Sequence, residues 1–536
     1  MENEPAIYKR ALRAGWWVLL AATLALVVIV RIRLLGLPLE RDEGEYAYAG
    51  QLMLQGIPPY KLAYSMKFPG TAAAYALLMS IFGQSIAGVH LGLLIVNLAT
   101  IGLLFVLGRR LLNEIGGIVA ATSYAVLSVT PYVLGVAAHA THFVVLPVLA
   151  GMLLLLRPPD RRSKKIIFTS GTFFGLGLLM KQPGLLFVVF GAVYLLGSDW
   201  RAHLNFGQIL LRNITFFCGA AVPLAVTCLV LWWAGVFQEF WFWTIVYAQQ
   251  YGTRVSVSYG IRVFLDCMPS VIEAAWPIWI LAGLGLVRCA LDKNHRSAAG
   301  FLIGLLLFSL LAVCPGFYFR PHYFILLLPA ISLMAGVALT TTANFLNAHS
   351  RMLRFIPILL FVASLGWPVW TEGDFFFQRS LAEACRMLNG TNPFPESIKI
   401  AEFLRAQTTE KDTVAVLGSE PQIYFYSQRH SATGYIYTYG LMEPQPYAHM
   451  MQQEMIQEIE AARPMYLLLV MHNKSWLAGP DSDLSIFRWA SGYCDANYDE
   501  VGLINIDESG TDYYFPVPPK LPKPTSDHIL IYRRKT

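Results

Sequence analysis

Four carboxylates crowd into six consecutive positions near the N-terminus, and a lysine follows them in the same loop. The acids are Glu40, Asp42, Glu43 and Glu45, and the lysine is Lys67. A carboxylate can remove the proton from an attacking group, and an ammonium can neutralise a phosphate that leaves. These residue types therefore indicate transfer of a group from a phosphate-linked compound. The plainer alternative is a solvated acidic loop face.

The composition places these residues in a membrane protein. Of the 536 residues, 56% are hydrophobic and only 14% are charged, and the mean hydropathy is +0.50. Soluble proteins carry about 25% charged residues. A purely soluble enzyme, a disordered chain and a disulfide-stapled secreted domain are therefore excluded.

The charge divides the chain into two parts. Residues 1–370 carry 26 Lys and Arg against 13 Asp and Glu, whereas residues 371–536 carry 14 against 21. The first part is therefore interpreted as a basic membrane body and the second as a soluble domain.

Apolar runs divide the membrane body into about eleven predicted transmembrane helices, since a helix needs about 20 apolar residues to cross the hydrocarbon. A further apolar stretch, residues 71–83, is too short to cross and is predicted to lie at the membrane interface. The predicted spans are residues 14–35, 86–108, 115–134, 141–156, 165–180, 183–198, 209–234, 271–290, 298–315, 322–342 and 354–370.

The basic residues orient these spans. The N-terminal segment and alternate connecting loops hold 17 of the 26 basic residues of the membrane body. By the positive-inside rule these loops and the N-terminus face the cytoplasm. The first loop, residues 36–85, and the tail from residue 371 are then extracytoplasmic.

The tail is predicted to be a small soluble α/β domain that follows the all-α polytopic membrane domain. The sequence leaves open whether Cys385 and Cys494 pair. It also leaves open whether Glu420 and Arg429 contact an acceptor or belong to a buried ion pair. The expected elements are a helix at residues 398–407 and strands at 413–417, 465–470 and 528–532.

The stretch from Arg41 to Tyr60 reads R-D-E-G-E-Y-A-Y-A-G-Q-L-M-L-Q-G-I-P-P-Y. It resembles the first-loop motif of the GT-C glycosyltransferases, in particular glycosyltransferase family 39. That family includes the protein O-mannosyltransferases and the bacterial transferases that add aminoarabinose to lipid A. The motif is an Asp-Glu pair, a Tyr-Ala three residues later and a helix that ends in Gly. The resemblance covers about residues 10–370 in order and topology.

The resemblance implies roles for three residues of the first loop. Asp42 matches the catalytic base of the family, Glu43 its acidic neighbour, and Lys67 the lysine near the donor phosphate. Family members typically have Lys-Pro-Pro where this chain has Lys67-Phe68-Pro69-Gly70. The donor implied by the resemblance is a sugar on a polyprenyl phosphate.

Other basic residues on the outer side are candidates for binding the donor phosphate. Lys181 lies at a tight break between two spans, where family members have a lysine. Arg320 and His322 open the tenth span, and a guanidinium suits phosphate because its fork is bidentate and always charged. Arg254 lies in the outer loop 235–270. An interfacial anchor is the alternative role for Arg320.

A second set of residues is assigned to contacts with the sugar or the acceptor. Aromatic and amide groups suit a sugar ring, although aromatic residues at this level often form an interfacial belt. In relatives the loop that contains Gln250 folds over the donor site. The set comprises Glu45, Tyr46, Tyr60, His139, His142, Gln250 and Tyr251.

A divalent metal is the only cofactor that the sequence suggests. His139 and His142 form a pair that Glu43 or Asp42 could complete. Two histidines are fewer than the three protein ligands of a typical catalytic zinc. A structural or acceptor-contacting role for both histidines is the alternative.

The sequence thus predicts an integral-membrane inverting glycosyltransferase of the bacterial inner membrane. It would transfer a hexose or pentose from a polyprenyl-phosphate donor to an extracytoplasmic lipid, glycan or protein. Its partners would be membrane lipids and these substrates, and no nucleic acid. The alternative is a transporter or flippase of lipid-linked sugars without transfer chemistry. Transporters tend to show repeated halves and matching broken helices, and the sequence shows neither.

Overall fold

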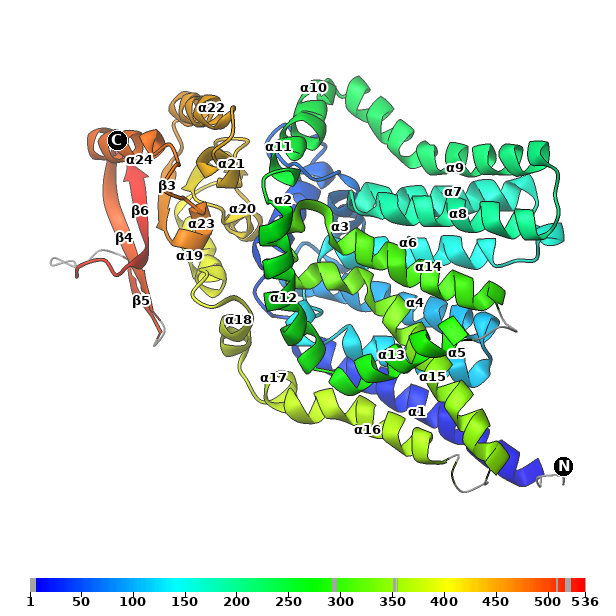
Figure 1. Ribbon diagram of the computed structural model, residues 1–536. Coiled ribbons are helices and arrows are strands. Elements are labelled where there is room, and N and C mark those ends of the chain that lie inside the picture. The colour runs from blue at the N-terminus through cyan, green and yellow to red at the C-terminus, as the bar shows by residue number, and fades with distance from the viewer. Residues whose placement is uncertain are drawn as a thin grey trace. The chain divides into compact units, whose positions relative to one another are not determined.

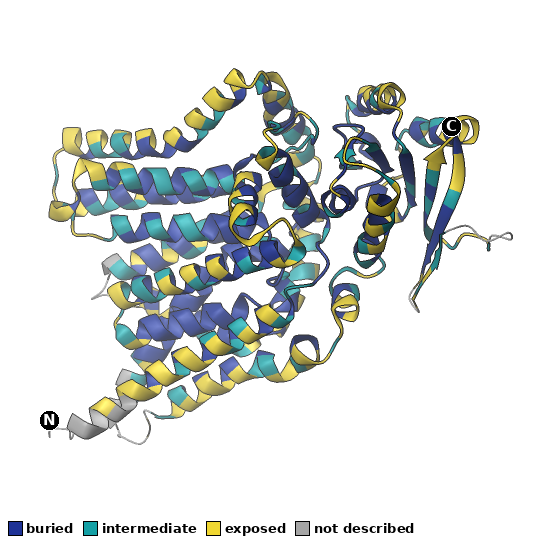
Figure 2. Cartoon of the chain, turned by 180° about the vertical axis from the view of Figure 1, so that it is seen from behind, coloured by how far each residue is buried: buried dark blue, intermediate teal, exposed yellow. Residues whose placement is uncertain are grey.

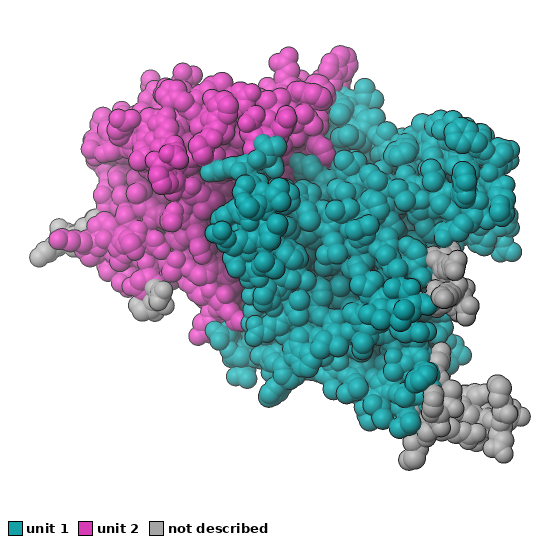
Figure 3. Space-filling model, in the orientation of Figure 1, with its two compact units in different colours: residues 1–35, 90–229, 251–379 teal, residues 36–89, 230–250, 380–536 magenta. Residues whose placement is uncertain are grey.

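The computed structural model describes residues 6–291, 296–349, 353, 355–507, 510–515 and 522–535 (Figure 1). Its contacts divide the chain into two compact units, coloured separately in Figure 3. Unit 1 comprises residues 1–35, 90–229 and 251–379, and unit 2 comprises residues 36–89, 230–250 and 380–536. The tail therefore shares a unit with the first loop. This division by contacts does not test the predicted end of the membrane part at residue 370.

Unit 1 consists almost wholly of helices. Its neighbouring pairs include α6 with α7, α7 with α8, and α13 with α15. The α-helices that lie wholly or mostly in unit 1 are α1 (Ala6–Arg33), α4 (Ile86–Leu111), α5 (Glu114–Leu127), α6 (Ala140–Leu155), α7 (Lys164–Met180), α8 (Gly184–Arg201), α9 (Phe206–Trp233), α12 (Val257–Glu273), α13 (Trp276–Leu291), α14 (Arg296–Val313), α15 (Leu328–His349), α16 (Phe355–Thr371) and α17 (Gly373–Phe377). Its short 3-10 helices are η1 (Pro131–Val133), η2 (Pro159–Arg161), η4 (Pro315–Phe317) and η5 (Pro321–Leu326).

The long helices of unit 1 expose apolar side chains, which soluble helices keep inside. On α9 these include Leu210, Phe217 and Leu229, and the outward faces stand out in Figure 2. Such faces suit lipid rather than water. Among the described residues, four helices are long and apolar enough to cross a membrane, or five if one bent pair is a single span. The chain is therefore a multi-pass membrane protein.

Each of the eleven predicted spans falls on a helix of the structure. The spans at residues 14–35, 86–108, 183–198 and 209–234 coincide with the four long apolar helices, and the others with shorter ones. The stretch at 71–83 is helix α3 (Gly70–Phe82). The predicted helix positions are confirmed, whereas the total number of crossings stays a prediction.

The outer loop 235–270 contains more helix than the sequence predicted. It holds α10 (Phe237–Trp241), a π-helix (Phe242–Tyr247), α11 (Ala248–Gly252) and most of α12. Aromatic residues fill the π-helix, which obscured its helical character in the sequence. Single-turn π-helices are often found at functional sites.

Unit 2 combines the first loop with the α/β tail. Helix α2 (Arg41–Leu54) contacts both α3 and α20. The helices of the tail are α18 (Leu381–Asn389), α19 (Phe394–Gln407), α20 (Pro421–Ser427), α21 (Tyr439–Met442), α22 (Ala448–Ala462), α23 (Asn473–Trp476) and α24 (Ser485–Asn497). Its strands are β1 (Thr413–Leu417), β2 (His430–Ser431), β3 (Tyr466–Met471), β4 (Tyr498–Ile506), β5 (Thr511–Tyr514) and β6 (Asp527–Arg534).

The six strands form one mixed sheet in the order β2-β1-β3-β6-β4-β5. Strand β1 pairs in parallel with β2 and β3, whereas β6 pairs antiparallel with β3 and β4. The central strands β1 and β3 are mostly buried and read as continuous apolar runs, as strands covered on both faces do. The predicted α/β tail, with its helix and three strands, is confirmed.

The buried cysteines of the tail answer the question that the sequence left open. Cys385 on α18 and Cys494 on α24 are both free thiols. Burial raises the pKa of each thiol to about 12. Because the thiolate is the reactive form, both cysteines are inert packing residues.

Candidate active site

Helix α2 begins with a capping box made by two of the four clustered acids. The Glu40 side chain accepts a hydrogen bond from the backbone of Glu43, and the Glu43 side chain accepts one from the backbone of Glu40. This reciprocal pair satisfies donors that a helix start otherwise leaves open. The acid cluster is therefore partly explained by the helix start that it builds. Asp42 and Glu45 make different contacts.

Two glycines let α2 pack very closely within unit 2. A Cβ atom on Gly44 would lie 2.7 Å from the backbone nitrogen of Gln422 in α20. One on Gly50 would lie 2.9 Å from the carbonyl oxygen of Ala72 in α3. Neither approach leaves room for a side chain. The helix that carries Asp42 is therefore held firmly between its two neighbours.

Lys67 lies between two carboxylates of α2. Its Nζ atom is 2.8 Å from Asp42 Oδ1 and 2.6 Å from Glu45 Oε2. Asp42 and Glu45 are three positions apart, so they share one face of the helix. The side chains of Lys67 and Asp42 are 17% and 18% exposed, whereas that of Glu45 is 5% exposed. The cluster is thus half-buried and has one negative charge in excess.

The loop before α3 is shaped to present this lysine. Tyr60 adopts a left-handed backbone conformation with φ of 66°, which is rare for a bulky residue and costs about 1–3 kcal/mol. Its hydroxyl donates a 2.8 Å hydrogen bond to the carbonyl oxygen of Lys67. Ser65 donates to Glu45 at 2.5 Å. Hydrogen bonds from within the first loop therefore hold both Lys67 and Glu45 in place.

Charge and burial oppose each other at Lys67. Burial alone would lower the pKa of Lys67, but the carboxylates of Asp42 and Glu45 raise it well above its ordinary value. The ammonium also lies 4.6 Å from the ring centre of Tyr46, a favourable cation–π distance. Burial raises the pKa of Glu45, although Lys67 partly counteracts this. Lys67 therefore stays cationic throughout the neutral range.

A small pocket of about 30 Å³ opens beside the cluster within unit 2. Glu45 and Lys67 provide its charged wall, and Tyr46, Tyr60 and Phe68 provide aromatic walls. Three predicted contact residues and the predicted phosphate lysine thus line one cavity.

The remaining candidates gather in unit 1 around the segment 318–323. The ring of Tyr251 stacks on Tyr318 with centres 4.5 Å apart, and the Arg320 guanidinium lies 6.0 Å from the Tyr318 ring centre. Lys181 Nζ is 4.1 Å from the ring centre of Tyr323. Residues distant in sequence therefore converge on one short segment of η5 and the turn before it.

One histidine of this segment stacks on a histidine from another part of unit 1. His322 stacks on His139 with ring centres 3.9 Å apart and an angle of 11° between the rings. His139 and His322 are both buried, and so is His142. Phe317, just before this segment, and Phe319, within it, have φ of 56° and 43°. Left-handed conformations of aromatic residues often mark functional sites.

Two further expected residues, Arg254 and Gln250, fall in different units. Arg254 is exposed in unit 1, and Gln250 ends the middle segment of unit 2. Arg31 is buried and donates to the carbonyl oxygens of Ser128 and Gly135. Arg33 is the half-buried neighbour that bonds Phe375 and Arg379.

The ion pair suspected in the tail exists with a different partner. Glu420 is fully buried and pairs at 3.0 Å with Arg41, not with Arg429. Arg429 donates to the backbone of Thr408 and Ser427. Both residues therefore have structural partners, and acceptor contact is not needed to explain either of them.

Sequence reasoning missed one residue of the cluster. Tyr437 of the tail donates a 3.2 Å hydrogen bond to Asp42 Oδ1. The two residues are separated by 395 positions, and Tyr437 lies outside every helix and strand. No local pattern could have found it.

A sequence profile for the family described as dolichyl-phosphate-mannose-protein mannosyltransferase matches residues 67–233, about a third of the chain. No curated protein matches the chain at a significant level. The profile begins at Lys67 itself.

Solved structures extend this similarity to the whole chain. ArnT from Cupriavidus metallidurans in the apo state aligns with a TM-score of 0.58 at 16% identity, over 87% of this chain and 94% of that chain. The same protein bound to undecaprenyl phosphate aligns with a TM-score of 0.55 at 16% identity, over 97% and 98%. AglB from Archaeoglobus fulgidus, in complex with an inhibitory peptide and a dolichol-phosphate, aligns with a TM-score of 0.55 at 11% identity, over 95% and 75%. The chain therefore has the GT-C fold that its first loop predicted.

Proposed function

We propose that this GT-C-fold protein is an inverting glycosyltransferase that moves a sugar from a polyprenyl phosphate to an extracytoplasmic acceptor. The observation that carries the proposal is the half-buried cluster of Asp42, Lys67 and Glu45 at the start of α2. Structures with the same fold hold undecaprenyl phosphate or a dolichol-phosphate. The sugar is a hexose or pentose, and the acceptor is a lipid, a glycan or a protein.

Asp42 is the proposed catalytic base. An acceptor O–H group attacks the anomeric carbon of the sugar while Asp42 takes the proton. The bond between that carbon and the phosphate oxygen breaks, and its electron pair leaves with the polyprenyl phosphate. Direct displacement inverts the anomeric centre. The carboxylate is 18% exposed, so it is accessible to such a group.

Cations stabilise the phosphate that leaves. Lys67 is the first candidate because it stays cationic and lines the pocket beside Asp42. In unit 1, Lys181, Arg320 and His322 lie around the segment 318–323 and are also proposed as phosphate-binding residues. Exposed Arg254 would bind the donor by charge alone. Electrostatic stabilisation of this kind is commonly the largest single contribution to catalysis.

Aromatic and polar residues are proposed to bind the sugar or the acceptor. Tyr46, Tyr60 and Glu45 line the pocket, and aromatic faces with a few polar groups suit a sugar ring. Tyr251 presents a stacked ring in unit 1. The proposed set also includes His139, His142 and Gln250.

A divalent metal bound by His139, His142 or Glu43 stays a prediction. Within unit 1 the stacked His139 and His322 offer two imidazoles, one fewer than the protein ligands of a typical catalytic zinc. Glu43 already serves the capping box of α2. Dialysis against a chelator followed by add-back of single metal ions tests this prediction, and unchanged transfer would rule a metal out.

The proposal includes a location. Residues 1–370 form the transmembrane catalytic domain and residues 371–536 an extracytoplasmic domain of a bacterial inner-membrane protein. The N-terminus lies in the cytoplasm, in agreement with the distribution of basic loops. Labelling of single introduced cysteines in intact cells and in lysed cells tests this orientation.

A transporter of lipid-linked sugars is the rival function. A transport pathway needs cations to bind a lipid phosphate, but it needs no carboxylate with an adjacent accessible pocket. The Asp42 cluster is therefore better explained by transfer chemistry.

The decisive experiment is a transfer assay in nanodiscs with radiolabelled polyprenyl-phosphate sugars and an envelope extract as acceptor. Wild-type protein is compared with Asp42→Asn. Label that moves only with the wild type supports the enzyme and its base. Label that moves equally with both proteins removes Asp42 from the mechanism. Lipid movement across sealed vesicles without transfer establishes the transporter instead.

A further inference from the structure

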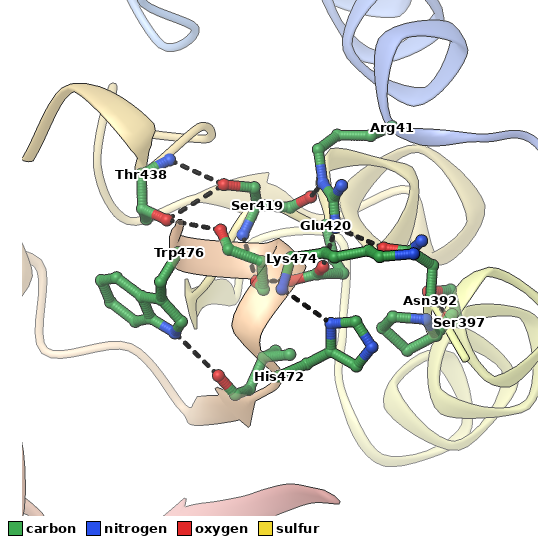
Figure 4. A network of polar contacts seen from close by, with 12 residues as sticks. Arg41, Asn392, Ser397, Ser419, Glu420, Thr438, His472, Lys474 and Trp476 are labelled. Carbon is green, nitrogen blue, oxygen red and sulfur yellow. Dashed lines mark hydrogen bonds and ion pairs between the residues drawn. The ribbon is translucent and has the colours of Figure 1, made fainter. Parts of the chain in front are cut away.

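The first residue of α2 is tied deeply into the tail. Arg41 is only 6% exposed, although it is charged. Its guanidinium donates to Glu420 Oε1 at 3.0 Å, Asn392 Oδ1 at 3.2 Å, the hydroxyl of Tyr439 at 2.9 Å and the carbonyl oxygen of Ser419 at 2.5 Å. All of these groups belong to unit 2, and Figure 4 shows Ser419, Glu420 and Asn392 around Arg41.

The second carboxylate oxygen of Glu420 is hydrogen-bonded as well. Ser475 donates to Glu420 Oε2 at 2.7 Å and accepts a 2.8 Å hydrogen bond from the backbone nitrogen of Ser419. Both serines are fully buried. A buried ion pair is favourable only when its remaining polar atoms are bonded in this way. The network therefore holds the start of α2 rigidly against the tail.

The second residue of α2 is Asp42, and the tail holds this residue as well. The hydroxyl of Tyr437 donates to Asp42 Oδ1, the same oxygen that Lys67 contacts at 2.8 Å. The ring of Tyr437 also lies 5.5 Å from Lys67 Nζ. Two donors on one oxygen fix the rotation of the carboxyl group about its last bond.

A three-residue segment of the tail makes both connections. Tyr439 contacts Arg41, and Tyr437 contacts Asp42. Their rings pack edge to face with centres 4.8 Å apart. Thr438 between them is buried, and its backbone nitrogen donates to Ser419 Oγ at 2.9 Å while its hydroxyl donates to the Ser475 carbonyl at 3.0 Å. Tyr437 and Tyr439, on one anchored segment, thus form hydrogen bonds with two consecutive residues of α2.

We propose that Tyr437 is a positioning residue for catalysis, and that the segment 437–439 completes the active site by orienting the Asp42 carboxylate. The proposal rests on the proposed function, in which Asp42 is the base. It assigns to the tail a direct part in transfer. A shift of about 1 Å in a catalytic group can cost roughly 100-fold in rate, so loss of one of two orienting bonds has a measurable effect.

The test compares Tyr437→Phe with Tyr435→Phe. Each substitution removes one hydroxyl, and Tyr435 donates its own to Glu454, away from Asp42. With radiolabelled donor in nanodiscs, Tyr437→Phe is expected to lower kcat about 10-fold with an unchanged KM for the donor. Tyr435→Phe is expected to keep both values within about two-fold, since its hydroxyl bonds Glu454 and not Asp42.

A double-mutant cycle on thermal stability supplies a readout that needs no activity. Tyr437→Phe is expected to lower Tm by about 2 °C in the wild-type background and by nothing further in an Asp42→Ala background. Tyr435→Phe is expected to give the same change of Tm in both backgrounds. This coupling would survive even if the protein transfers no sugar.

Three results would overturn the proposal. A Tyr437→Phe protein with wild-type kcat shows that the bond does not orient the base. A raised KM with unchanged kcat makes Tyr437 a substrate contact instead. Additive Tm changes show that the two residues do not interact. Failure of the proposed function is a separate outcome, because then the wild type itself transfers no label.

Discussion

Two ion clusters in this protein have opposite composition. In unit 1, Asp199 lies between two arginines, 3.3 Å from Arg162 and 2.7 Å from Arg212. In unit 2, Lys67 lies between two carboxylates, those of Asp42 and Glu45. The first cluster has one positive charge in excess and the second has one negative charge in excess.

The two clusters also differ in their access to solvent. The side chains of Asp199 and Arg162 are 0% and 2% exposed. Arg162 also donates hydrogen bonds to the hydroxyl of Ser198 and the carbonyl oxygen of Arg157. The Lys67 cluster adjoins a pocket instead and is nearly one-fifth exposed at Lys67. The sealed cluster fixes connections between helices, whereas the open one keeps charge available to a ligand.

The largest expected effect lies at the open cluster. Asp42→Asn should lower the transfer rate by about 1,000-fold, because an amide cannot accept the proton of the attacking group. Its Tm should stay within about 2 °C of the wild type, since Asn keeps the shape of the side chain. Single-turnover transfer and a thermal melt measure the two values. A large loss of Tm with normal turnover would reverse the roles of the two clusters.

The sealed cluster should show the opposite result. Asp199→Asn leaves buried Arg162 and the 15% exposed Arg212 without a carboxylate, and breaking such a cluster costs about 3–5 kcal/mol. We expect a marked fall in Tm and a normal rate per folded molecule. Asp160→Asn, at an exposed position of η2, is the matched control and should melt like the wild type. An unchanged Tm for Asp199→Asn would contradict a structural role.

Lys67→Met should have an intermediate effect on catalysis. It removes the cation proposed to neutralise the leaving phosphate, so kcat/KM for the donor should fall about 100-fold. Lys61→Met, which changes an exposed lysine of the same loop, is the control. Steady-state kinetics with a fixed acceptor measure the change. Equal activity of the two variants would remove Lys67 from the donor site.

The smallest expected effect is a pH dependence of stability. Burial raises the pKa of Glu45 and Lys67 counteracts it, so removal of Lys67 should raise that pKa further. A raised folded pKa for a carboxyl group gives stability at low pH that is lost as pH rises through it. The Tm gap between wild type and Lys67→Met should therefore widen by a few degrees between pH 5 and pH 8. A gap that narrows would contradict this coupling.

Hydropathy and local capping determined much of this fold in advance. Long apolar runs must form helices in a membrane, because no other structure satisfies the backbone there. All eleven predicted spans accordingly fall on helices. The α/β tail followed from alternating patterns and its ordinary charge. The acid-rich start of α2 followed from residues that both cap a helix and suit catalysis.

The sequence by itself determined that Asp42 and Glu45 share a helix face, because their spacing sets this. It also indicated, through the family resemblance, that Lys67 belongs to the same site. Only the tertiary structure decided that Glu420 pairs with Arg41 and that Tyr437 reaches Asp42. The physical reason is sequence separation. Contacts across 379 and 395 positions depend on the packing of the tail with the first loop, and no local pattern encodes that packing.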